Sequence, residues 1–497
     1  MKAFLMFRDQ DFGPHCPLPL QAKALVQDLE LKTLFDAMAQ GDNFVFDIAR
    51  TSILSGTEDI DTILYRQDIL KDCLKYPSVI REIYQLPIEA KTNKQKGWLG
   101  IYGHYPTAIL SGSHEFIKML FELLKRLRGI ADDNAALFES EGFKRFFAMI
   151  QQELDDNYFA IAENHLKELK FREGVMISVD LGQGNEGTNY ILRKPLSTKW
   201  WKEIFIRENE AYSIYIADRD DAGARALGEL KDTGVDLVAN ALAQSADHID
   251  NFFKMLQIEL GFYIGCINLH EQLAQMGCAT CLPLPAPTNE RRHSFHGLYD
   301  ICLALTKKQK IVGNEVNADQ KDLVMITGAN QGGKSTFLRS IGLAQLMMQS
   351  GMFTPADDFT ANLCTGVFTH YKREEDKTMT SGKLDEELSR MDDIADTISS
   401  NSLILFNESF AATNEREGSE ISRQITSALL EQDVKVFFVT HQYDLAHSFF
   451  DRGLENAIFL RAERKEDGER TYKLIEAKPL PTSFGEDVYH IVFQDDQ

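Results

Sequence analysis

The sequence predicts a multidomain chain in which a mostly α-helical region is followed by an α/β domain with a parallel sheet. Three observations lead to this fold class. Apolar residues recur three and four positions apart over much of residues 28–283, which is typical of helices. A proline-rich segment follows at 281–287. Beyond it, short apolar strands alternate with helical segments, a pattern that favours a mostly parallel sheet.

Length and composition limit the class of protein. The chain has 497 residues, of which 44% are hydrophobic, so it is long enough for two or more globular domains. It contains no apolar run near the roughly 20 residues of a membrane-spanning helix, and its seven cysteines are scattered. We therefore expect a cytoplasmic protein with free thiols. Because the formal net charge is −22, any contact with DNA must come from a local patch.

The helical region contains one small β insert, at about residues 171–217. Residues 175–181 alternate like a strand, and residues 189–192 can return as its partner. The segment 182–187 between them reads GQGNEG, which has the letters of a dinucleotide-binding motif. That motif requires a helix to follow, whereas here the chain runs on to Pro195. The sequence therefore predicts a polar hairpin turn.

Basic and aromatic residues are concentrated in the same insert. Such a combination can contact nucleic acid through its phosphates and stacked bases. The alternative is a solvated face with two packed tryptophans. The residues concerned are Lys194, Lys199, Trp200, Trp201, Lys202 and Arg207.

The segment 281–287 is the predicted linker between the two domains. Its three prolines at alternate positions favour an extended chain. We therefore predict a mostly helical domain at residues 1–285 and an α/β domain at residues 286–497.

The second domain contains the sequence of a phosphate-binding loop (P-loop). Residues 328–335 read GANQGGKS, between a predicted strand at 323–326 and a predicted helix at 335–348, and they match the P-loop pattern in full. Glycines let backbone N–H groups point at phosphate oxygens, and the helix adds its positive end. Lys334 is expected to bridge the β and γ phosphates, and Ser335 to ligate Mg²⁺. ATP and Mg²⁺ are thus the expected cofactors. The expected nucleotide-binding residues in this segment are Gly328, Ala329, Asn330, Gln331, Gly332, Gly333, Lys334, Ser335 and Thr336.

Two further predicted strands end in residues suited to hydrolysis. Asn407 and Glu408 follow the strand at 403–406, and His441 follows the strand at 435–439. In P-loop ATPases an acidic residue usually holds the metal at the position of Asn407. The neutral Asn407 should therefore bind Mg²⁺ more weakly. Glu408 is placed to polarise the attacking water, and His441 to contact the γ-phosphate. The alternatives are a strand-end cap for Glu408 and a structural role for His441.

These motifs together resemble the MutS family of DNA mismatch repair proteins, within the wider ABC-type ATPases. The likeness is strongest in the second half of the chain and weaker in the helical half. The resemblance implies that Ser381 is presented to the nucleotide of a neighbouring subunit. The segments that carry the resemblance are 327–336, 351–356, 368–370, 381–387, 402–408, 440–441 and 483–485, with Thr413 and Gly418.

The sequence departs from the family pattern in several places. Only about 30 residues precede the expected core helices, so we expect a short form without the mismatch-recognition domain. Only 12 residues follow Gly485, so we also expect the family's C-terminal dimerisation helices to be largely missing and the nuclease tail of the MutS2 type to be absent. Asn407 replaces an acid, and Phe410-Ala411-Ala412 replaces a Gly-Arg-Gly switch. These departures put mismatch specificity in question, although the ATP site is retained.

The resemblance implies an ATP-dependent DNA-binding protein of the MutS type. It implies a homodimer in which Ser381 of one chain completes the Lys334 site of the other, with the insert at 171–217 as a DNA clamp. ATP would close the dimer, and lever helices would move the clamps. Three other functions stay open: an ATPase scaffold acting on protein partners without DNA, a nucleotide-binding regulator without turnover, and recognition of branched DNA instead of mismatches.

Overall fold

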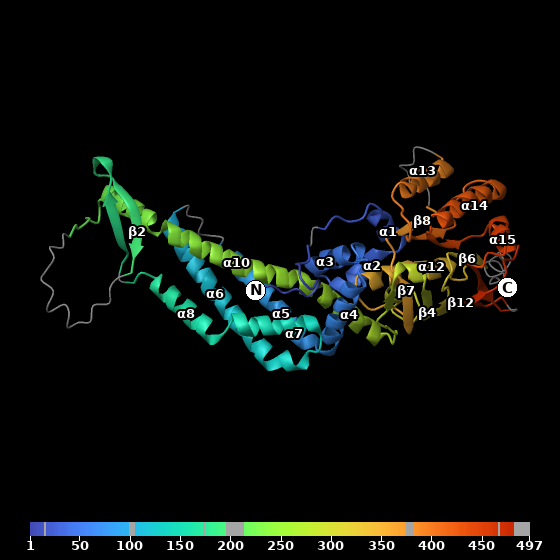
Figure 1. Ribbon diagram of the computed structural model, residues 1–497, viewed down its shortest axis with the longest axis horizontal. Coiled ribbons are helices and arrows are strands. Elements are labelled where there is room, and N and C mark those ends of the chain that lie inside the picture. Colours follow the sequence, from blue (N-terminus) through green and yellow to red (C-terminus); the bar gives the residue numbers. More distant parts are fainter. Residues whose placement is uncertain are drawn as a thin grey trace, which may run out of the picture. The chain divides into compact units, whose positions relative to one another are not determined.

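The chain divides into two compact units in the computed structural model, which describes residues 1–13, 16–98, 105–172, 174–194, 213–373, 382–465 and 468–481. Unit 1 comprises residues 1–3, 81–138 and 143–257, and unit 2 comprises residues 4–80, 139–142 and 258–497. Figure 1 labels many of the elements of both units. Among the described residues, no helix is long and apolar enough to cross a membrane.

Unit 1 is built mainly from long helices, as the apolar spacing predicts. Three of them extend beyond the unit, because α5 and α7 begin in unit 2 and α10 ends there. Leu120, Leu124 and Leu127 of α6 are almost completely buried, in agreement with the three-and-four spacing of that segment. The helices are α5 (Pro77–Trp98), α6 (Pro106–Asn134), α7 (Glu141–Glu153), α8 (Asp156–Glu168) and α10 (Asp221–Gln275), with the short 3₁₀ turn η1 (Ala135–Leu137).

The β insert of unit 1 is an antiparallel hairpin, which confirms the predicted turn. Strands β1 (Met176–Leu181) and β2 (Gly187–Arg193) pair through Ile177 and Leu192. The short 3₁₀ segment η2 (Gln183–Asn185) lies in the turn, so no helix follows the glycines as dinucleotide binding would require. The basic and aromatic residues at 199–207 lie outside the described residues.

Unit 2 contains a six-stranded sheet in the order β12-β11-β6-β10-β9-β8. All neighbouring pairs are parallel except β11 and β12, so the prediction of a mostly parallel sheet is confirmed. The strands are β6 (Leu323–Gly328), β8 (Val367–Tyr371), β9 (Leu403–Asn407), β10 (Lys435–Val439), β11 (Ala457–Arg464) and β12 (Arg470–Glu476).

Helices cover both faces of this sheet. On one face, α14 and α15 pack against Ile404, Phe406 and Phe438 in a single apolar cluster. On the other face lies α12, since a Cβ atom on its Gly342 would lie 2.8 Å from Cδ1 of Leu405. The helices of unit 2 are α1 (Ala22–Asp28), α2 (Leu31–Ala39), α3 (Asn43–Leu54), α4 (Ile60–Lys75), α11 (Ile301–Lys307), α12 (Lys334–Gln349), α13 (Lys383–Ala395), α14 (Glu415–Glu431) and α15 (Tyr443–Asp451).

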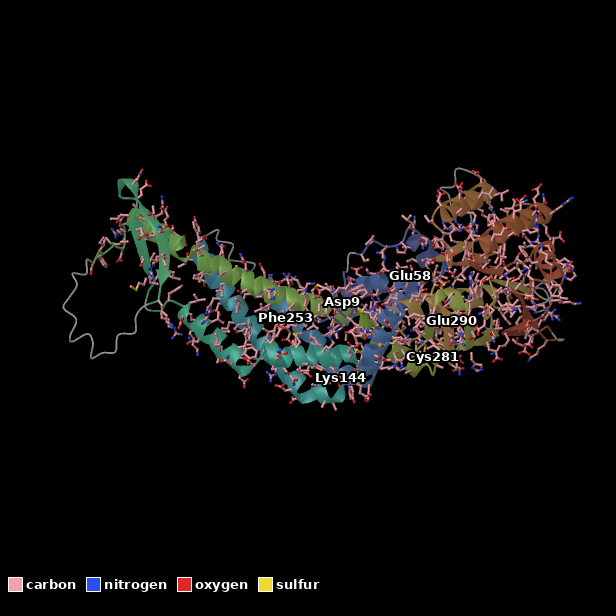
Figure 2. The ribbon with its side chains drawn as sticks, in the orientation of Figure 1. Asp9, Glu58, Lys144, Phe253, Cys281 and Glu290 are labelled. Atoms are coloured by element: carbon pink, nitrogen blue, oxygen red, sulfur yellow. The ribbon has the colours of Figure 1, made fainter. Side chains whose placement is uncertain are left out.

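A smaller sheet has the order β3-β7-β4-β5, and it includes part of the segment that was expected to be a linker. The segment 281–287 is extended, as its prolines favour, but it belongs to this sheet and is not a free linker. Cys281, labelled in Figure 2, exchanges two backbone hydrogen bonds with Thr354 (3.1 and 2.8 Å). The strands are β3 (Leu284–Ala286), β4 (His293–Leu298), β5 (Asn314–Asn317) and β7 (Asp358–Asn362), with the 3₁₀ turn η3 (Thr288–Glu290).

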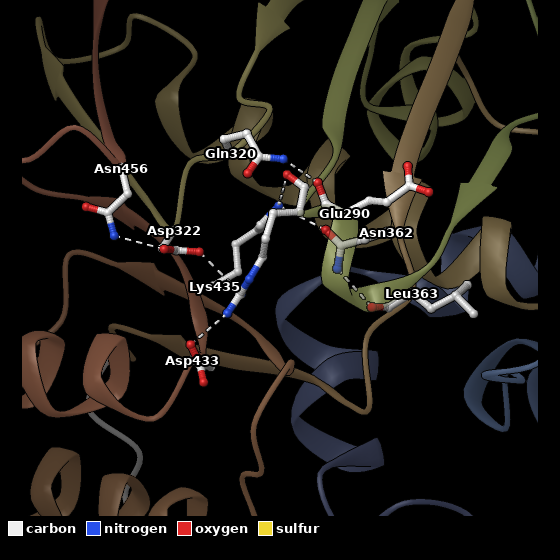
Figure 3. Close-up of polar contacts among 9 residues, drawn as sticks. Glu290, Gln320, Asp322, Asn362, Leu363, Asp433, Lys435 and Asn456 are labelled. Carbon is white, nitrogen blue, oxygen red and sulfur yellow. Dashed lines mark hydrogen bonds and ion pairs between the residues drawn. The ribbon is translucent and has the colours of Figure 1, made fainter.

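A buried lysine joins the two sheets (Figure 3). Lys435 begins β10 and is 2% exposed, and its Nζ donates to Oδ1 of Asn362 at the end of β7 (3.0 Å). The Asn362 amide in turn donates to the carbonyl of Leu363 (2.9 Å). Burial lowers the pKa of Lys435 to about 8. The contact fixes the amino end of the parallel sheet against its smaller neighbour.

A second buried cation, Arg66 on α4, ties three segments of unit 2 together. It is 1% exposed. Its Nε donates to the carbonyl of Met6 (2.8 Å), and one terminal nitrogen donates to the carbonyl of Ser350, just after α12 (3.2 Å). The next residue, Gly351, has φ +83° and leaves no room for a Cβ, which would lie 2.6 Å from Cβ of Arg66. The end of α12 is therefore held by the guanidinium group.

We expect Arg66→Met to lower the free energy of unfolding by roughly 2–5 kcal/mol, because two buried carbonyls lose their donor. Urea unfolding, followed by circular dichroism, measures the change. Arg50→Met, on the exposed side of α3, is the matched control and should change stability by less than about 0.5 kcal/mol. Equal effects of the two substitutions would contradict the role given to Arg66.

Candidate functional site

The predicted phosphate-binding loop joins β6 to α12, so the strand and helix expected around it are both present. Its glycines are required by backbone geometry. Gly328 has φ +108°, and a Cβ there would lie 2.8 Å from the backbone N of Ala462 on β11. Gly333 has φ +86° and is the N-cap residue of α12. A side chain at either position would strain or displace the loop.

Lys334 lies within this loop and is only 5% exposed. Its Nζ donates hydrogen bonds to the carbonyls of Gly328 (3.1 Å) and Ala329 (2.9 Å). Burial lowers the pKa of Lys334 to about 8, and Glu408 partly opposes this shift. A phosphate beside the ammonium group would favour its charged form.

The other predicted residues meet this loop at the carboxyl ends of β9 and β10. Since β10 lies between β6 and β9, the three strand ends are adjacent. Ser335 Oγ donates to Oδ1 of Asn407 (2.9 Å). Oε1 of Glu408 lies 2.7 Å from Nε2 of His441. The hydrogen bond from His441 lowers the pKa of Glu408, so this carboxylate is ionised at neutral pH and better suited to orienting a water molecule than to removing its proton.

A cavity of about 530 Å³ opens over these residues, within the usual range for small-molecule sites. Leu303 and Val312 supply an apolar part of its wall. Of the predicted set, Gly328, Ala329 and Asn407 lie beside the lining residues without lining the cavity. Ser381 lies outside the described residues. The predicted residues that line the cavity are Asn330, Gln331, Gly332, Gly333, Lys334, Ser335, Thr336, Glu408 and His441.

Strand β12 contributes two residues that sequence reasoning missed. Tyr472 lines the cavity, and its Cδ1 would lie 3.6 Å from a Cβ on Gly333. Arg470 donates from Nε to the carbonyl of Asn330 in the loop (3.3 Å). The alternation of the segment 470–476 could have revealed a strand. The position of this strand beside the loop depends on its pairing with β11, and no local sequence pattern predicts that pairing.

His370 on β8 is a third missed residue. It is fully buried and stacks on Phe410, with ring centroids 5.0 Å apart. Burial lowers the pKa of His370 to about 4, so the ring is neutral at neutral pH. Its Nε2 donates to the carbonyl of Glu387 on α13 (2.9 Å), and its Nδ1 lies 2.8 Å from Oγ of Ser409, whose hydroxyl is also within hydrogen-bond distance of the backbone carbonyl of His370 (2.5 Å). The residue after Glu408 is thereby linked to α13.

Two neutral oxygens could help to hold a divalent cation at this site. They are Oγ of Ser335 and Oδ1 of Asn407, which lie 2.9 Å apart. Mg²⁺ prefers oxygen ligands and commonly takes most of them from water and substrate phosphates. Within the described part of the chain, no group of three or more His, Cys, Asp or Glu side chains could hold a metal ion. The residues therefore fit a Mg²⁺ ion that is held mainly by a bound nucleotide.

Comparison with known proteins gives matches in both halves of the chain. The model for the MutS2 N-terminal domain matches residues 58–276, and that for MutS domain V matches residues 324–495. Endonuclease MutS2 of Lacticaseibacillus casei (strain BL23) is 33% identical over 183 residues, which cover 36% of this chain and 22% of that protein. DNA mismatch repair protein MutS of Thermotoga petrophila is 24% identical over 428 residues, 83% of this chain and 51% of that protein. MutS protein homolog 4 of Homo sapiens is 29% identical over 151 residues, 30% of this chain and 16% of that protein. The matches thus span about half or less of the length of these relatives.

The lowered pKa of Lys334 predicts that binding of a nucleoside triphosphate weakens in alkaline solution. Below the pKa of about 8 the ammonium is charged and attracts phosphate. Above it, affinity should fall by up to about tenfold per pH unit. Titration with a fluorescent nucleotide at pH 7, 8 and 9 measures this. Lys334→Arg should remove the pH dependence, because arginine stays charged. Equal affinity of the unsubstituted protein at pH 7 and 9 would contradict the prediction.

Proposed function

Because the chain belongs to the MutS family, we propose that it hydrolyses ATP and uses the energy to control binding to mismatched or branched DNA. One observation supports the ATPase part most directly. Lys334, the Ser335–Asn407 pair and the Glu408–His441 pair come from three separate segments and meet around one cavity. If Glu408 only capped the end of a strand, residues from three segments would have no reason to meet around the same cavity.

Each residue has a role that its geometry supports. The Lys334 ammonium and the loop N–H groups hold the β and γ phosphates. Ser335 and Asn407 offer oxygens to Mg²⁺, which when bound neutralises charge on the phosphates. Glu408 orients the water that attacks the γ-phosphorus, and ADP leaves. His441 holds the Glu408 carboxylate in place beforehand, so the carboxylate must exchange this partner for the water.

The contacts behind Glu408 provide a route for conformational coupling. Ser409 bonds His370, and His370 bonds the carbonyl of Glu387 on α13. In sequence, α13 begins two residues after Ser381, the residue expected to reach a second subunit. We propose that replacement of the Glu408–His441 contact by γ-phosphate and water shifts α13 and closes a homodimer. The movement would pass to the hairpin through α10, whose residues 221–257 belong to unit 1 and 258–275 to unit 2.

Contact with DNA is proposed for the hairpin insert at 171–217. Arg193 at the end of β2 is exposed and bonds only the Ser178 hydroxyl among the described residues (3.0 Å). One observation favours a protein partner instead. Lys194 Nζ lies 2.5 Å from Glu168 Oε1, which reduces the local positive charge in a chain of net charge −22. An ATPase scaffold acting on proteins is therefore the second candidate function.

The role of Glu408 predicts that Glu408→Gln slows ATP turnover by roughly hundredfold or more while ATP affinity changes little, since the amide keeps the shape but loses the charge. Lys334→Ala should instead weaken ATP binding itself. Phosphate release and nucleotide titration separate the two effects. The control is Glu431→Gln, exposed at the end of α14, which should turn over ATP normally. Full activity in both site variants would refute the assignment.

The neutral Asn407 predicts a weak hold on Mg²⁺. Asn407→Asp should lower the Mg²⁺ concentration needed for half-maximal turnover by roughly tenfold, because a carboxylate adds a charged ligand. The measurement is phosphate release over a Mg²⁺ series at fixed ATP. Asn401→Asp adds the same charge before the opposite end of β9 and should have no effect. An unchanged Mg²⁺ requirement in Asn407→Asp would remove Asn407 from the metal site.

The DNA proposal predicts binding that responds to ATP and falls with salt. Fluorescent homoduplex, single-mismatch duplex and four-way junction DNA should be titrated at two salt concentrations, with and without ATP. Preference for the mismatch or for the junction identifies the substrate. If none of the three binds at low salt while ATP is still hydrolysed, the protein-scaffold function replaces DNA binding.

A further inference from the structure

A second cavity of about 530 Å³ lies in unit 1, between α6 and α8. It is formed by residues of one face of each helix. His114, Lys118 and Phe121 are spaced four and three residues apart on α6, and Leu166 with Lys170 lie four apart at the end of α8 and just beyond it. None of these residues belongs to the phosphate-binding loop or to its cavity.

The walls of this cavity are firmly packed. His114 is 5% exposed, and its Nε2 donates to the carbonyl of Leu166 (2.8 Å), which holds α6 against α8. Phe121 is 6% exposed and meets the ring of Phe159 edge-on, with centroids 6.3 Å apart. Leu166 is also buried. The hollow is therefore part of the packed structure of unit 1.

Four cations line the cavity, and they set its charge. They are Lys118, Lys167, Lys170 and Arg172, all exposed. In the part of the chain that the structure describes, none of their side chains forms an ion pair or hydrogen bond. This concentration of free positive charge is notable in a chain whose net charge is −22, because it creates a local attraction for anions that the protein as a whole lacks.

The two acidic residues in the lining do not cancel this charge. Glu163 Oε1 lies 2.5 Å from Lys125 Nζ, and Glu122 Oε1 lies 3.6 Å from the same nitrogen. The hydrogen bond from Lys125 lowers the pKa of Glu163. Both carboxylates thus share a lysine that does not line the cavity. Lys167 adds a weaker attraction to Glu163, and Lys118, Lys170 and Arg172 stay available to a ligand.

We propose that this cavity is a second phosphate-binding site, which receives a nucleotide either as a free molecule or as one unit of a nucleic-acid strand. Its volume falls in the range of small-ligand sites, roughly 300–1,000 Å³. Several converging cations suit a phosphate, which carries about −1.5 to −2 charges as a monoester at neutral pH. The buried Phe121 and Leu166 wall suits the less polar part of a nucleotide. The site works independently of the phosphate-binding loop.

The test uses the full-length Lys334→Ala variant, so that the loop no longer dominates binding. Inorganic pyrophosphate, ATP and single-stranded oligothymidylate are titrated separately at low salt. Adding Lys118→Ala and Lys170→Ala should weaken binding of the preferred probe at least tenfold. For the oligonucleotide it should also make the slope of log affinity against log salt shallower by about 1.4, since each contact contributes about 0.7. Lys144→Ala on α7, labelled in Figure 2, removes an exposed lysine outside the cavity and should change nothing.

Charge-preserving variants separate binding from folding. Lys118→Arg with Lys170→Arg should restore affinity to within a few fold. Tight binding of pyrophosphate and ATP without the strand identifies a free nucleotide as the ligand, and tight binding of the strand identifies nucleic acid. If no probe binds the Lys334→Ala protein, or if the two alanine substitutions leave binding unchanged, the proposal is wrong. ATP turnover of Lys118→Ala/Lys170→Ala in the otherwise unsubstituted chain reports on the loop separately.

Discussion

The buried guanidinium group of Arg66 fixes the helix on which the proposed nucleotide site depends. Its bond to the carbonyl of Ser350 holds the end of α12, and its bond to Met6 ties that end to the N-terminal segment. The other end of α12 begins with Lys334 in the phosphate-binding loop. An α-helix is stiff along its axis, so fixing one end of these 16 residues, a length of about 24 Å, restricts the other. The geometry of the loop therefore depends on a contact outside it.

Strain is concentrated where β9 leaves the sheet. Glu408 and Phe410 have φ values of +54° and +57°, which non-glycine residues adopt at some energetic cost. The surrounding contacts hold them there: Glu408 N donates to the carbonyl of Val439 (2.9 Å), and Gln442 donates to the carbonyl of Phe410 (3.2 Å). The conformation of this turn determines both how Phe410 packs in the core and where the Glu408 carboxylate points. A change in one therefore alters the other.

Local patterns in the sequence predicted the parts of the site that are consecutive in the chain. The strand–loop–helix around Lys334 and the hairpin at 176–193 follow from residue spacing and turn chemistry alone. Asn407, Glu408 and His441 could be placed near the loop because parallel strands share one carboxyl edge. Tyr472 and His370 could not, since their positions depend on the pairing of distant strands. For the same reason, the prolines at 283–287 indicated an extended chain but not its partner, β7.

The hydrogen bonds of Lys334 to the carbonyls of Gly328 and Ala329 mean that the loop is already folded as a receptor. A preformed loop would lose little conformational entropy when an anion binds. The same bonds compete with the incoming phosphate for the ammonium group. If a nucleotide binds here as proposed, its affinity is the difference between the internal contacts of Lys334 and the contacts with the ligand, so weaker internal contacts would give tighter binding.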